Sequence, residues 1–376
     1  PNEAGNDRTF SLDVFPQEFS SDGCSDYRVS SIEVKNGDGS YAFMGKVSGY
    51  NIYPGKYRLE GLPSLFATEN DTVDTLEIWL RDASTKVTVI LCYSVFEEKD
   101  IITRAVKVFN GNEKTMYLNR IMSTTIDFME SAFDFVHFDG RHTMERNLTR
   151  EPISYGVQSI GSTRGASSHQ HNPFVILCDH DANEEYGNYY GFSLVYSGNF
   201  RCEVEKDQFD QTRIQFGINP KGFSYQLKPN EKFIAPEVVL AYSSQGFTKL
   251  SHLYHNVYRE NLCRSPRAKE IRPIVINSWE ATYFNFDDTK LLNIAREAVD
   301  MGVDLFVLDD GWFGKRDDDS SGLGDWNVNT SKLKKGLKGL SDEINQLGLK
   351  VGLWIEPEMV SEDSNLYRAH PDWCLS

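Results

Sequence analysis

The feature that most constrains the fold is a change in hydrophobic pattern near residue 245. Before it, the chain consists of short β-branched and aromatic runs, such as residues 87–96, 174–178 and 191–196. Turn signals rich in glycine and asparagine, such as residues 35–39, separate these runs, and no stretch shows a convincing helical spacing. Many antiparallel strands over this length predict a large β-sandwich.

After residue 245, strands alternate with helices. The apolar spacing of residues 246–262 predicts a linker helix. Beyond it, we expect buried strands at 273–277 and 304–308 and a third strand at 350–355, with helices at 291–301 and 340–347 between them. Strands that alternate with helices indicate parallel βαβ units.

The length of the second half limits its fold. A (β/α)8 barrel takes about 250 residues, whereas residues 272–376 offer 105 residues and three strands. Three units form either a small open sheet or the start of a larger domain, and we expect the second. The predicted organisation is multidomain, β plus α/β: a β-sandwich domain at 1–245, a helical linker at 246–271, and the first units of a truncated (β/α)8 TIM barrel at 272–376.

Charge and cysteine content narrow the class of partner. The chain has 39 basic and 55 acidic side chains, a net charge of −16, and no basic cluster. This disfavours nucleic acid and anionic membrane surfaces, because both need concentrated Lys and Arg, and leaves a neutral ligand open. The six cysteines are scattered without a C-x-x-C pair, and no stretch approaches the length of a membrane span. We expect reduced thiols in a cytoplasmic protein.

Tryptophan lies beside carboxylates where each predicted parallel strand ends. The three ends read 277–280 (Asn-Ser-Trp-Glu), 309–312 (Asp-Asp-Gly-Trp) and 354–358 (Trp-Ile-Glu-Pro-Glu). Ligands of parallel α/β folds bind at the carboxyl ends of strands. Apolar ring faces stack on the C–H face of a pyranose, and carboxylates accept hydrogen bonds from its hydroxyls, so this composition indicates a sugar site. The alternative is that the tryptophans fill the core.

Asp309 and Asp310 are the strongest candidates for ligand contact. Successive strand residues point to opposite faces, so one ligand reached by both requires a bend, which Gly311 permits. Two acids beside a buried strand are costly unless they are paired or face a ligand. A helix-capping or salt-bridged pair remains an alternative. Metal binding is weaker, because no nearby histidine completes a ligand set.

Other polar groups carry less specific signals. Glu356 and Glu358 could be a glycosidase pair, but we prefer a bracing role for Glu356. We interpret residues 315–319 as a solvated loop, and Asp325-Trp326 as a possible pocket rim. The H-x-H spacing within residues 168–172 is too common to indicate a metal or a catalytic triad, so we interpret it as ordinary loop histidines.

Several long motifs occur in order at suitable spacing, and together they resemble bacterial α-galactosidases (melibiases) of glycoside hydrolase family 36. The resemblance spans essentially the whole chain but only part of a family protein. It implies a β-supersandwich followed by a (β/α)8 barrel, and retaining removal of terminal α-linked galactose from melibiose- or raffinose-type sugars. It implies no metal or cofactor, and a homo-tetramer for the full-length form. The motifs lie at residues 52–56, 59–63, 164–174, 279–284, 308–314, 324–326, 352–360 and 366–373.

The resemblance also implies residue roles. The acids matching Asp309 and Asp310 hold galactose hydroxyls, and the tryptophans matching Trp279 and Trp354 line the pocket. The family's nucleophile is an Asp in a Lys-Trp-Asp motif and its acid/base is a later Asp; neither motif occurs here. We therefore expect both beyond Ser376 and expect this chain alone to be inactive. The alternatives are a catalytically silent sugar-binding protein and an α-N-acetylgalactosaminidase.

Overall fold

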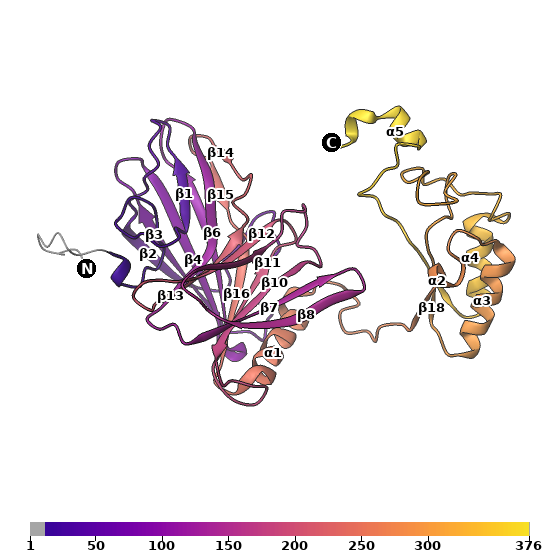
Figure 1. The fold of residues 1–376 in the computed structure, drawn as a ribbon, viewed down its shortest axis with the longest axis horizontal. Coiled ribbons are helices and arrows are strands. Elements are labelled where there is room, and N and C mark those ends of the chain that lie inside the picture. The colour runs from indigo at the N-terminus through magenta and orange to yellow at the C-terminus, as the bar shows by residue number, and fades with distance from the viewer. Residues whose placement is uncertain (1–11, 376) are drawn as a thin grey trace, which may run out of the picture. The chain divides into compact units, whose positions relative to one another are not determined.

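The computed structural model describes residues 12–375 and divides the chain into two units, Pro1–Ala268 and Lys269–Ser376 (Figure 1). Unit 1 is built from strands and closes with a helix, and unit 2 alternates strands and helices. The change of pattern in the sequence therefore corresponds to a change of architecture. No described helix is long and apolar enough to cross a membrane.

Two antiparallel sheets make up unit 1. The larger has the order β2-β3-β4-β5-β16-β11-β10-β7-β8, with β15 on β5, and the smaller has the order β1-β6-β13-β12, with β14 on β6. No α-helix precedes Gly246 among residues 12–375, in agreement with the sequence. The strands are β1 (Ile32–Lys35), β2 (Lys46–Pro54), β3 (Val73–Arg81), β4 (Val87–Phe96), β5 (Ile101–Asn110), β6 (Met116–Phe128), β7 (Phe133–Arg141), β8 (Met144–Pro152), β9 (Gly156–Gly161), β10 (His171–Asp179), β11 (Tyr189–Val195), β12 (Phe200–Lys206), β13 (Thr212–Ile218), β14 (Tyr225–Leu227), β15 (Lys232–Ile234) and β16 (Glu237–Ser243).

The apolar run of β10 is continuous because both of its faces are buried. Val175 and Leu177 point into a core shared with the smaller sheet, which contributes residues such as Phe216. Ile176 and Cys178 point the other way, into a core beneath a helix. Since side chains alternate along a strand, a strand buried on both faces has no polar positions to alternate with.

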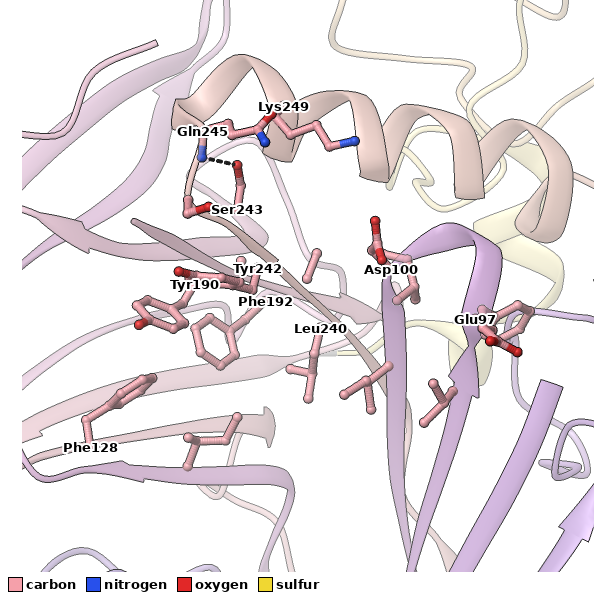
Figure 2. A pocket seen from close by; sticks show the side chains of 18 residues that line it. Glu97, Asp100, Phe128, Tyr190, Phe192, Leu240, Tyr242, Ser243, Gln245 and Lys249 are labelled. Carbon is pink, nitrogen blue, oxygen red and sulfur yellow. Dashed lines mark hydrogen bonds between the residues drawn. The ribbon is translucent and has the colours of Figure 1, made fainter. Parts of the chain in front are cut away.

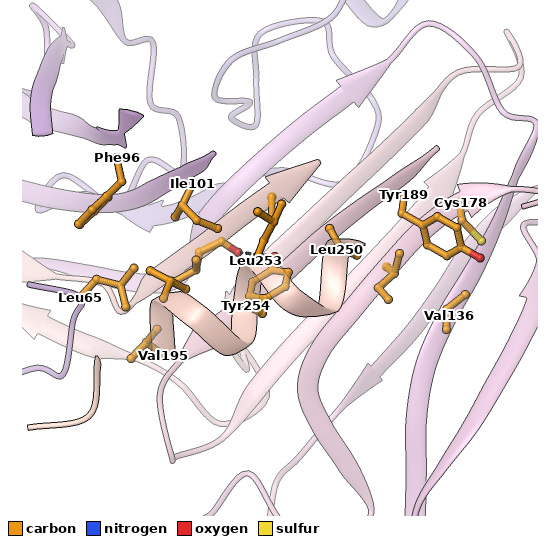
Figure 3. Packing of buried hydrophobic residues seen from close by; sticks show 14 of the residues in the cluster. Leu65, Phe96, Ile101, Val136, Cys178, Tyr189, Val195, Leu250, Leu253 and Tyr254 are labelled. Atoms are coloured by element: carbon orange, nitrogen blue, oxygen red, sulfur yellow. Dashed lines mark hydrogen bonds between the residues drawn. The ribbon is translucent and has the colours of Figure 1, made fainter. Parts of the chain in front are cut away.

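That helix is α1 (Gly246–Val257), which the π-helix η3 (Tyr258–Leu262) continues. Leu250, Leu253 and Tyr254 lie against the larger sheet near Tyr189 and Val195 (Figure 3). Helix α1 is thus packed onto unit 1, and the boundary in the structure follows Ala268, not residue 245. The apolar residues whose spacing predicts the helix are also the residues that pack it against the sheet.

A buried ion-pair network joins the N-terminal segment to the smaller sheet. Arg213 on β13 lies 2.8 Å from the Asp26 carboxylate and 2.7 Å from that of Asp127 on β6. Arg28 contacts the same two acids at 2.9 and 3.3 Å. All four side chains are at most 3% exposed, so each charge depends on the others for compensation.

Unit 2 holds a three-stranded parallel sheet in the order β17-β18-β19. The helices α3 and α4 lie side by side (Figure 1). Asp287 caps α3 by accepting a 2.8 Å hydrogen bond from the Lys290 amide, which satisfies one of the free N–H groups of its first turn. The elements are β17 (Val275–Asn277), α2 (Trp279–Thr282), α3 (Asp288–Asp300), β18 (Leu305–Leu308), α4 (Gly336–Gln346), β19 (Lys350–Leu353) and α5 (Asn365–Ala369), and short 3-10 helices lie at Leu12–Val14, Glu97–Lys99 and Pro371–Trp373.

The expectation of a buried strand at 273–277 is wrong for this chain. Ile274 and Val275 are 60% and 51% exposed. The reason is that β17 is an edge strand, paired on one side only, by β18. β18 carries the buried side chains instead, with Phe306 and Leu308 in the core of unit 2.

Candidate active site

The carboxyl ends of β17, β18 and β19 meet at one edge of the parallel sheet. Ile276 pairs with Phe306, Asn277 with Val307, and Leu308 with Leu353. The residues that follow these positions are the Trp- and carboxylate-rich segments singled out in the sequence. The topology therefore brings Asn277, Asp309 and Trp354 to neighbouring strand ends.

Asp309 is held by its neighbours but keeps partial exposure. Its Oδ2 accepts a 2.5 Å hydrogen bond from Asn277 Nδ2, and its Oδ1 accepts one of 2.8 Å from the Asp310 amide. Its own amide donates to Ser278 Oγ at 3.1 Å. Asn277 in turn accepts from the Trp279 amide at 2.7 Å, so one amide side chain orients both the acid and the tryptophan segment.

Asp310 is buried and paired with Arg316. The guanidinium donates from Nε to both carboxylate oxygens at 3.1 Å and from a terminal nitrogen to Oδ2 at 2.8 Å. Gly311 donates its amide to Oδ1 at 2.6 Å. The interpretation of residues 315–319 as a solvated loop is therefore wrong for Arg316, which is 5% exposed. The burial of Arg316 could have been predicted from the sequence, because a buried carboxylate such as Asp310 needs a counter-charge nearby.

Gly311 makes the bend after the two acids. Its φ is +93°, and a Cβ built there would lie 3.0 Å from Phe284 and 3.3 Å from Phe286. An L-residue is strained in that conformation and would also crowd two aromatic rings. The glycine thus allows Asp310 to turn toward Arg316 while Asp309 faces Asn277.

The tryptophans divide between core and site edge. Trp312 is buried, and its Nε1 donates a 3.0 Å hydrogen bond to the Trp354 carbonyl, so the core-filling alternative describes this residue. Trp354 is partly buried and lies nearly parallel to Phe313, with ring centroids 6.5 Å apart. Trp279 is also partly buried and packs edge-on against Phe284 at 5.1 Å. Trp279 and Trp354 therefore keep exposed surface beside the acids.

Two further acids behave differently from expectation. Asp325 is buried, and its carboxylate accepts hydrogen bonds from the Asn365 and Leu366 amides at 2.9 and 3.0 Å. It anchors the first turn of α5 rather than lining a rim. Burial and the nearby Glu358 carboxylate raise the pKa of Glu356. Within residues 12–375 the Glu356 carboxylate makes no hydrogen bond, so the structure does not support a bracing role for it.

A separate cavity of about 770 Å³ lies within unit 1. Figure 2 shows Phe128, Tyr190, Phe192 and Leu240 gathered on one side of it, with the start of α1 on another. Its lining is mainly apolar, and its two carboxylates, Glu97 and Asp100, come from one short turn between β4 and β5, whereas the acids of unit 2 follow separate parallel strands. We therefore place the candidate site at the strand ends of unit 2.

Comparison with known families agrees with the motifs. The family described as "Glycosyl hydrolase family 36 N-terminal domain" matches residues 1–228, and the one described as "Melibiase" matches residues 232–376. The chain belongs to glycosyl hydrolase family 36. The resemblance stated from the sequence is confirmed.

Relatives of this family 36 chain include two bacterial enzymes. The bifunctional alpha-galactosidase/sucrose kinase AgaSK of Mediterraneibacter gnavus is 48% identical over 375 residues, which cover 100% of this chain and 40% of that protein. The alpha-galactosidase AgaA of Geobacillus stearothermophilus is 47% identical, with coverage of 100% and 51%. The chain thus spans about half the length of the curated relatives it matches.

Solved structures give the same picture. A variant of AgaA in complex with 1-deoxygalactonojirimycin matches with a TM-score of 0.95 at 47% identity, covering 100% of this chain and 52% of that one. Other variants of AgaA were solved with stachyose and with raffinose.

Proposed function

We propose that this chain is part of a retaining α-galactosidase that removes terminal α-linked galactose from oligosaccharides such as melibiose or raffinose. The observation that carries the proposal is the edge at which Asp309, Asp310, Trp279 and Trp354 follow three neighbouring parallel strands. The names of the relatives and the raffinose and stachyose complexes of AgaA support the substrate class.

Asp309 and Asp310 differ in how many of their acceptor sites are free to bind galactose hydroxyls. A carboxylate offers about four lone-pair sites. At Asp310, the Gly311 amide and the Arg316 guanidinium make four contacts, two with each carboxylate oxygen. Asp309 is partly exposed and is bound by one side chain and one amide, so it offers the more open acceptor. We propose Asp309 as the main hydroxyl acceptor, with Asp310 as a secondary acceptor whose position Arg316 fixes.

Trp279 and Trp354 would provide the apolar contact. Each is partly buried and held by neighbouring aromatic rings, which limits the side-chain freedom lost when a sugar binds. No metal or cofactor is part of this proposal. Retaining cleavage needs a nucleophile and an acid/base, and we propose that sequence beyond Ser376 supplies both, since the relatives are about twice as long.

We also propose the architecture that the family implies: unit 1 as a β-supersandwich and unit 2 as the first units of a (β/α)8 barrel. The exposed apolar residues at both edges of the parallel sheet, Val275 on β17 and Leu353 on β19, suit pairing with further strands. A cytoplasmic homo-tetramer fits the free cysteines and the exposed side chains of the edge strand β2, Val47, Tyr50 and Ile52.

The test uses the full-length protein and the 376-residue chain side by side. We expect the full-length protein to hydrolyse an aryl α-galactoside in preference to the matching N-acetylgalactosaminide, and the short chain to hydrolyse neither. Asp309→Ala should lower kcat/KM by about 10–1,000-fold while leaving Tm near that of the wild type, since charged hydrogen bonds are worth about 1.5–3 kcal/mol each.

Asp304→Ala, on the same strand segment but at its opposite end, is the matched control and should keep kcat/KM. The proposal fails if the full-length protein has no α-galactosidase activity, or if the short chain turns over the substrate. The role of Asp309 fails if its variant unfolds while the remaining folded fraction keeps full specific activity.

A further inference from the structure

Strands β8, β7 and β10 place a cluster of potential metal ligands on one face of the larger sheet. His137 and Asp139 are two residues apart on β7, so their side chains share a face. His171 on β10 pairs directly with Asp139, and Thr149 on β8 pairs directly with His137. Residues 34 positions apart in sequence are thereby brought together by register, with an irregularity between His171 and Val175 adjusting the approach.

The ligand atoms of this cluster lie close to one another. Asp139 Oδ1 lies 3.0 Å from His137 Nδ1 and 2.9 Å from His171 Nδ1. Two ligands bonded to one tetrahedral Zn²⁺ at about 2.1 Å lie about 3.4 Å apart, so each pair of ligand atoms would open by about half an ångström when the ion binds. Across residues 12–375, this is the group of three such side chains whose ligand atoms lie within 4.8 Å of one another.

Hydrogen bonding alone does not satisfy the cluster. His137 Nδ1 is hydrogen-bonded to Asp139, whereas His171 Nδ1 is inaccessible to solvent and has no hydrogen-bond partner among the described residues. This nitrogen lies 2.9 Å from Asp139 Oδ1 without forming a hydrogen bond, so a neutral His171 leaves it unsatisfied, and a metal ion bound by both atoms would satisfy it. The interpretation of the H-x-H segment as ordinary loop histidines does not describe His171, because this residue begins strand β10 and its Nδ1 makes no hydrogen bond to any described residue.

The carboxylate is prepared for coordination. Thr149 Oγ1 donates a 2.6 Å hydrogen bond to Asp139 Oδ2, which leaves Oδ1 for the histidines and fixes the carboxylate plane.

From this geometry we propose that His137, Asp139 and His171 form a Zn²⁺ site that links β7 to β10. Two imidazole nitrogens and one carboxylate oxygen suit Zn²⁺, and water would complete the coordination. The side chains are 11%, 33% and 23% exposed, so water and the ion can reach the site from one side. The site lies wholly within unit 1 and does not depend on the proposed galactosidase activity.

Zn²⁺ itself is the probe, with the full 376-residue chain stripped by a chelator and then dialysed against buffered Zn²⁺. We expect uptake of one equivalent per chain and a higher Tm in its presence, because an ion that binds only the folded state stabilises it. His171→Gln and Asp139→Asn should each weaken Zn²⁺ binding by more than about 100-fold. Thr149→Val should weaken it by about 10–100-fold, the usual effect of removing a group that orients a ligand.

His169→Gln is the matched control, since His169 is an exposed histidine two residues before His171 and outside the cluster, and this variant should bind Zn²⁺ like the wild type. Circular dichroism of each variant confirms that the β unit is folded. The absence of saturable uptake by the wild type overturns the proposal, as does unchanged uptake by folded His171→Gln. Uptake that is lost in Cys263→Ser but kept in His171→Gln assigns the ion to the exposed thiol and also overturns it.

Discussion

Replacing Arg316 with leucine should destabilise unit 2 strongly. The guanidinium makes three contacts with the Asp310 carboxylate and donates to the Ser321 carbonyl at 3.0 Å. Both charged side chains are about 5% exposed, so water cannot replace the lost partner. Removing one member of a buried ion pair costs about 3–5 kcal/mol, mostly because the other charge is left uncompensated. We expect Arg316→Leu to lower the free energy of unfolding by that amount.

The chain provides a convenient signal for this measurement. Five of the six tryptophans lie in unit 2, at positions 279, 312, 326, 354 and 373. Urea denaturation followed by tryptophan fluorescence therefore reports mainly on unit 2, and far-UV circular dichroism follows the strands of unit 1. Lys315→Leu changes the exposed neighbour in the same loop and should alter stability by no more than about 0.5 kcal/mol.

A double-mutant cycle isolates the pair itself. Asp310→Asn alone should also destabilise, because it leaves the guanidinium buried without a counter-charge. The double variant should lose about 1–3 kcal/mol less than the sum of the two single changes, since the second change then removes an unpaired charge. A loss below about 1 kcal/mol for Arg316→Leu, or strict additivity in the double variant, would refute the buried ion pair.

Three further perturbations test other parts of the fold. Leu250→Ala should destabilise unit 1 by about 2–5 kcal/mol, because Leu250 is fully buried in the core beneath α1. Chemical denaturation followed by circular dichroism measures this loss, and Lys249→Ala, on the exposed face of α1, is the control. Equal effects of the two variants would mean that α1 is not packed against the sheet. Gly311→Ala should lower the stability of unit 2 by about 1–3 kcal/mol, because its φ of +93° strains an L-residue, and unchanged denaturation would contradict that conformation. Burial raises the pKa of Asp26, but hydrogen bonds from Arg28 and its neighbours outweigh it and lower the pKa below its ordinary value. The stabilisation by the Asp26 carboxylate is therefore complete above that ordinary value of about 3.9 and is lost as pH falls through the folded-state pKa. Tm measured from about pH 5 to pH 2 should fall less steeply for Asp26→Asn than for the wild type. Parallel Tm curves for the two proteins would contradict a lowered pKa of Asp26.

The sequence predicted local structure well where one short segment held all the information. The apolar run 87–96 became β4 with the same bounds, and the spacing after Gly246 became α1. The weak point was burial. Val275 has the composition of an interior strand, yet it is exposed because burial depends on whether a second neighbour pairs with that strand.

The candidate site, too, has features that the sequence predicted and features that it did not. The adjacent acids, the glycine after them and the tryptophans at the strand ends were visible in the sequence, because each is defined by its position relative to a strand. The partner of each charge was not visible. Asp310 pairs with Arg316 inside a loop that looked solvated, and Asp325 binds the amides of α5 forty residues away.

By itself, the sequence determined where strands and helices form, where the chain changes from sheet to βαβ units, and which family it belongs to. These properties follow from hydrophobic period and from motif order along the chain, both of which are local. Only the tertiary structure decided that α1 packs on unit 1, that Arg316 is buried, and that His137, Asp139 and His171 converge. Such contacts depend on which strands are neighbours and in what register, and a shift of one residue would turn each side chain to the opposite face.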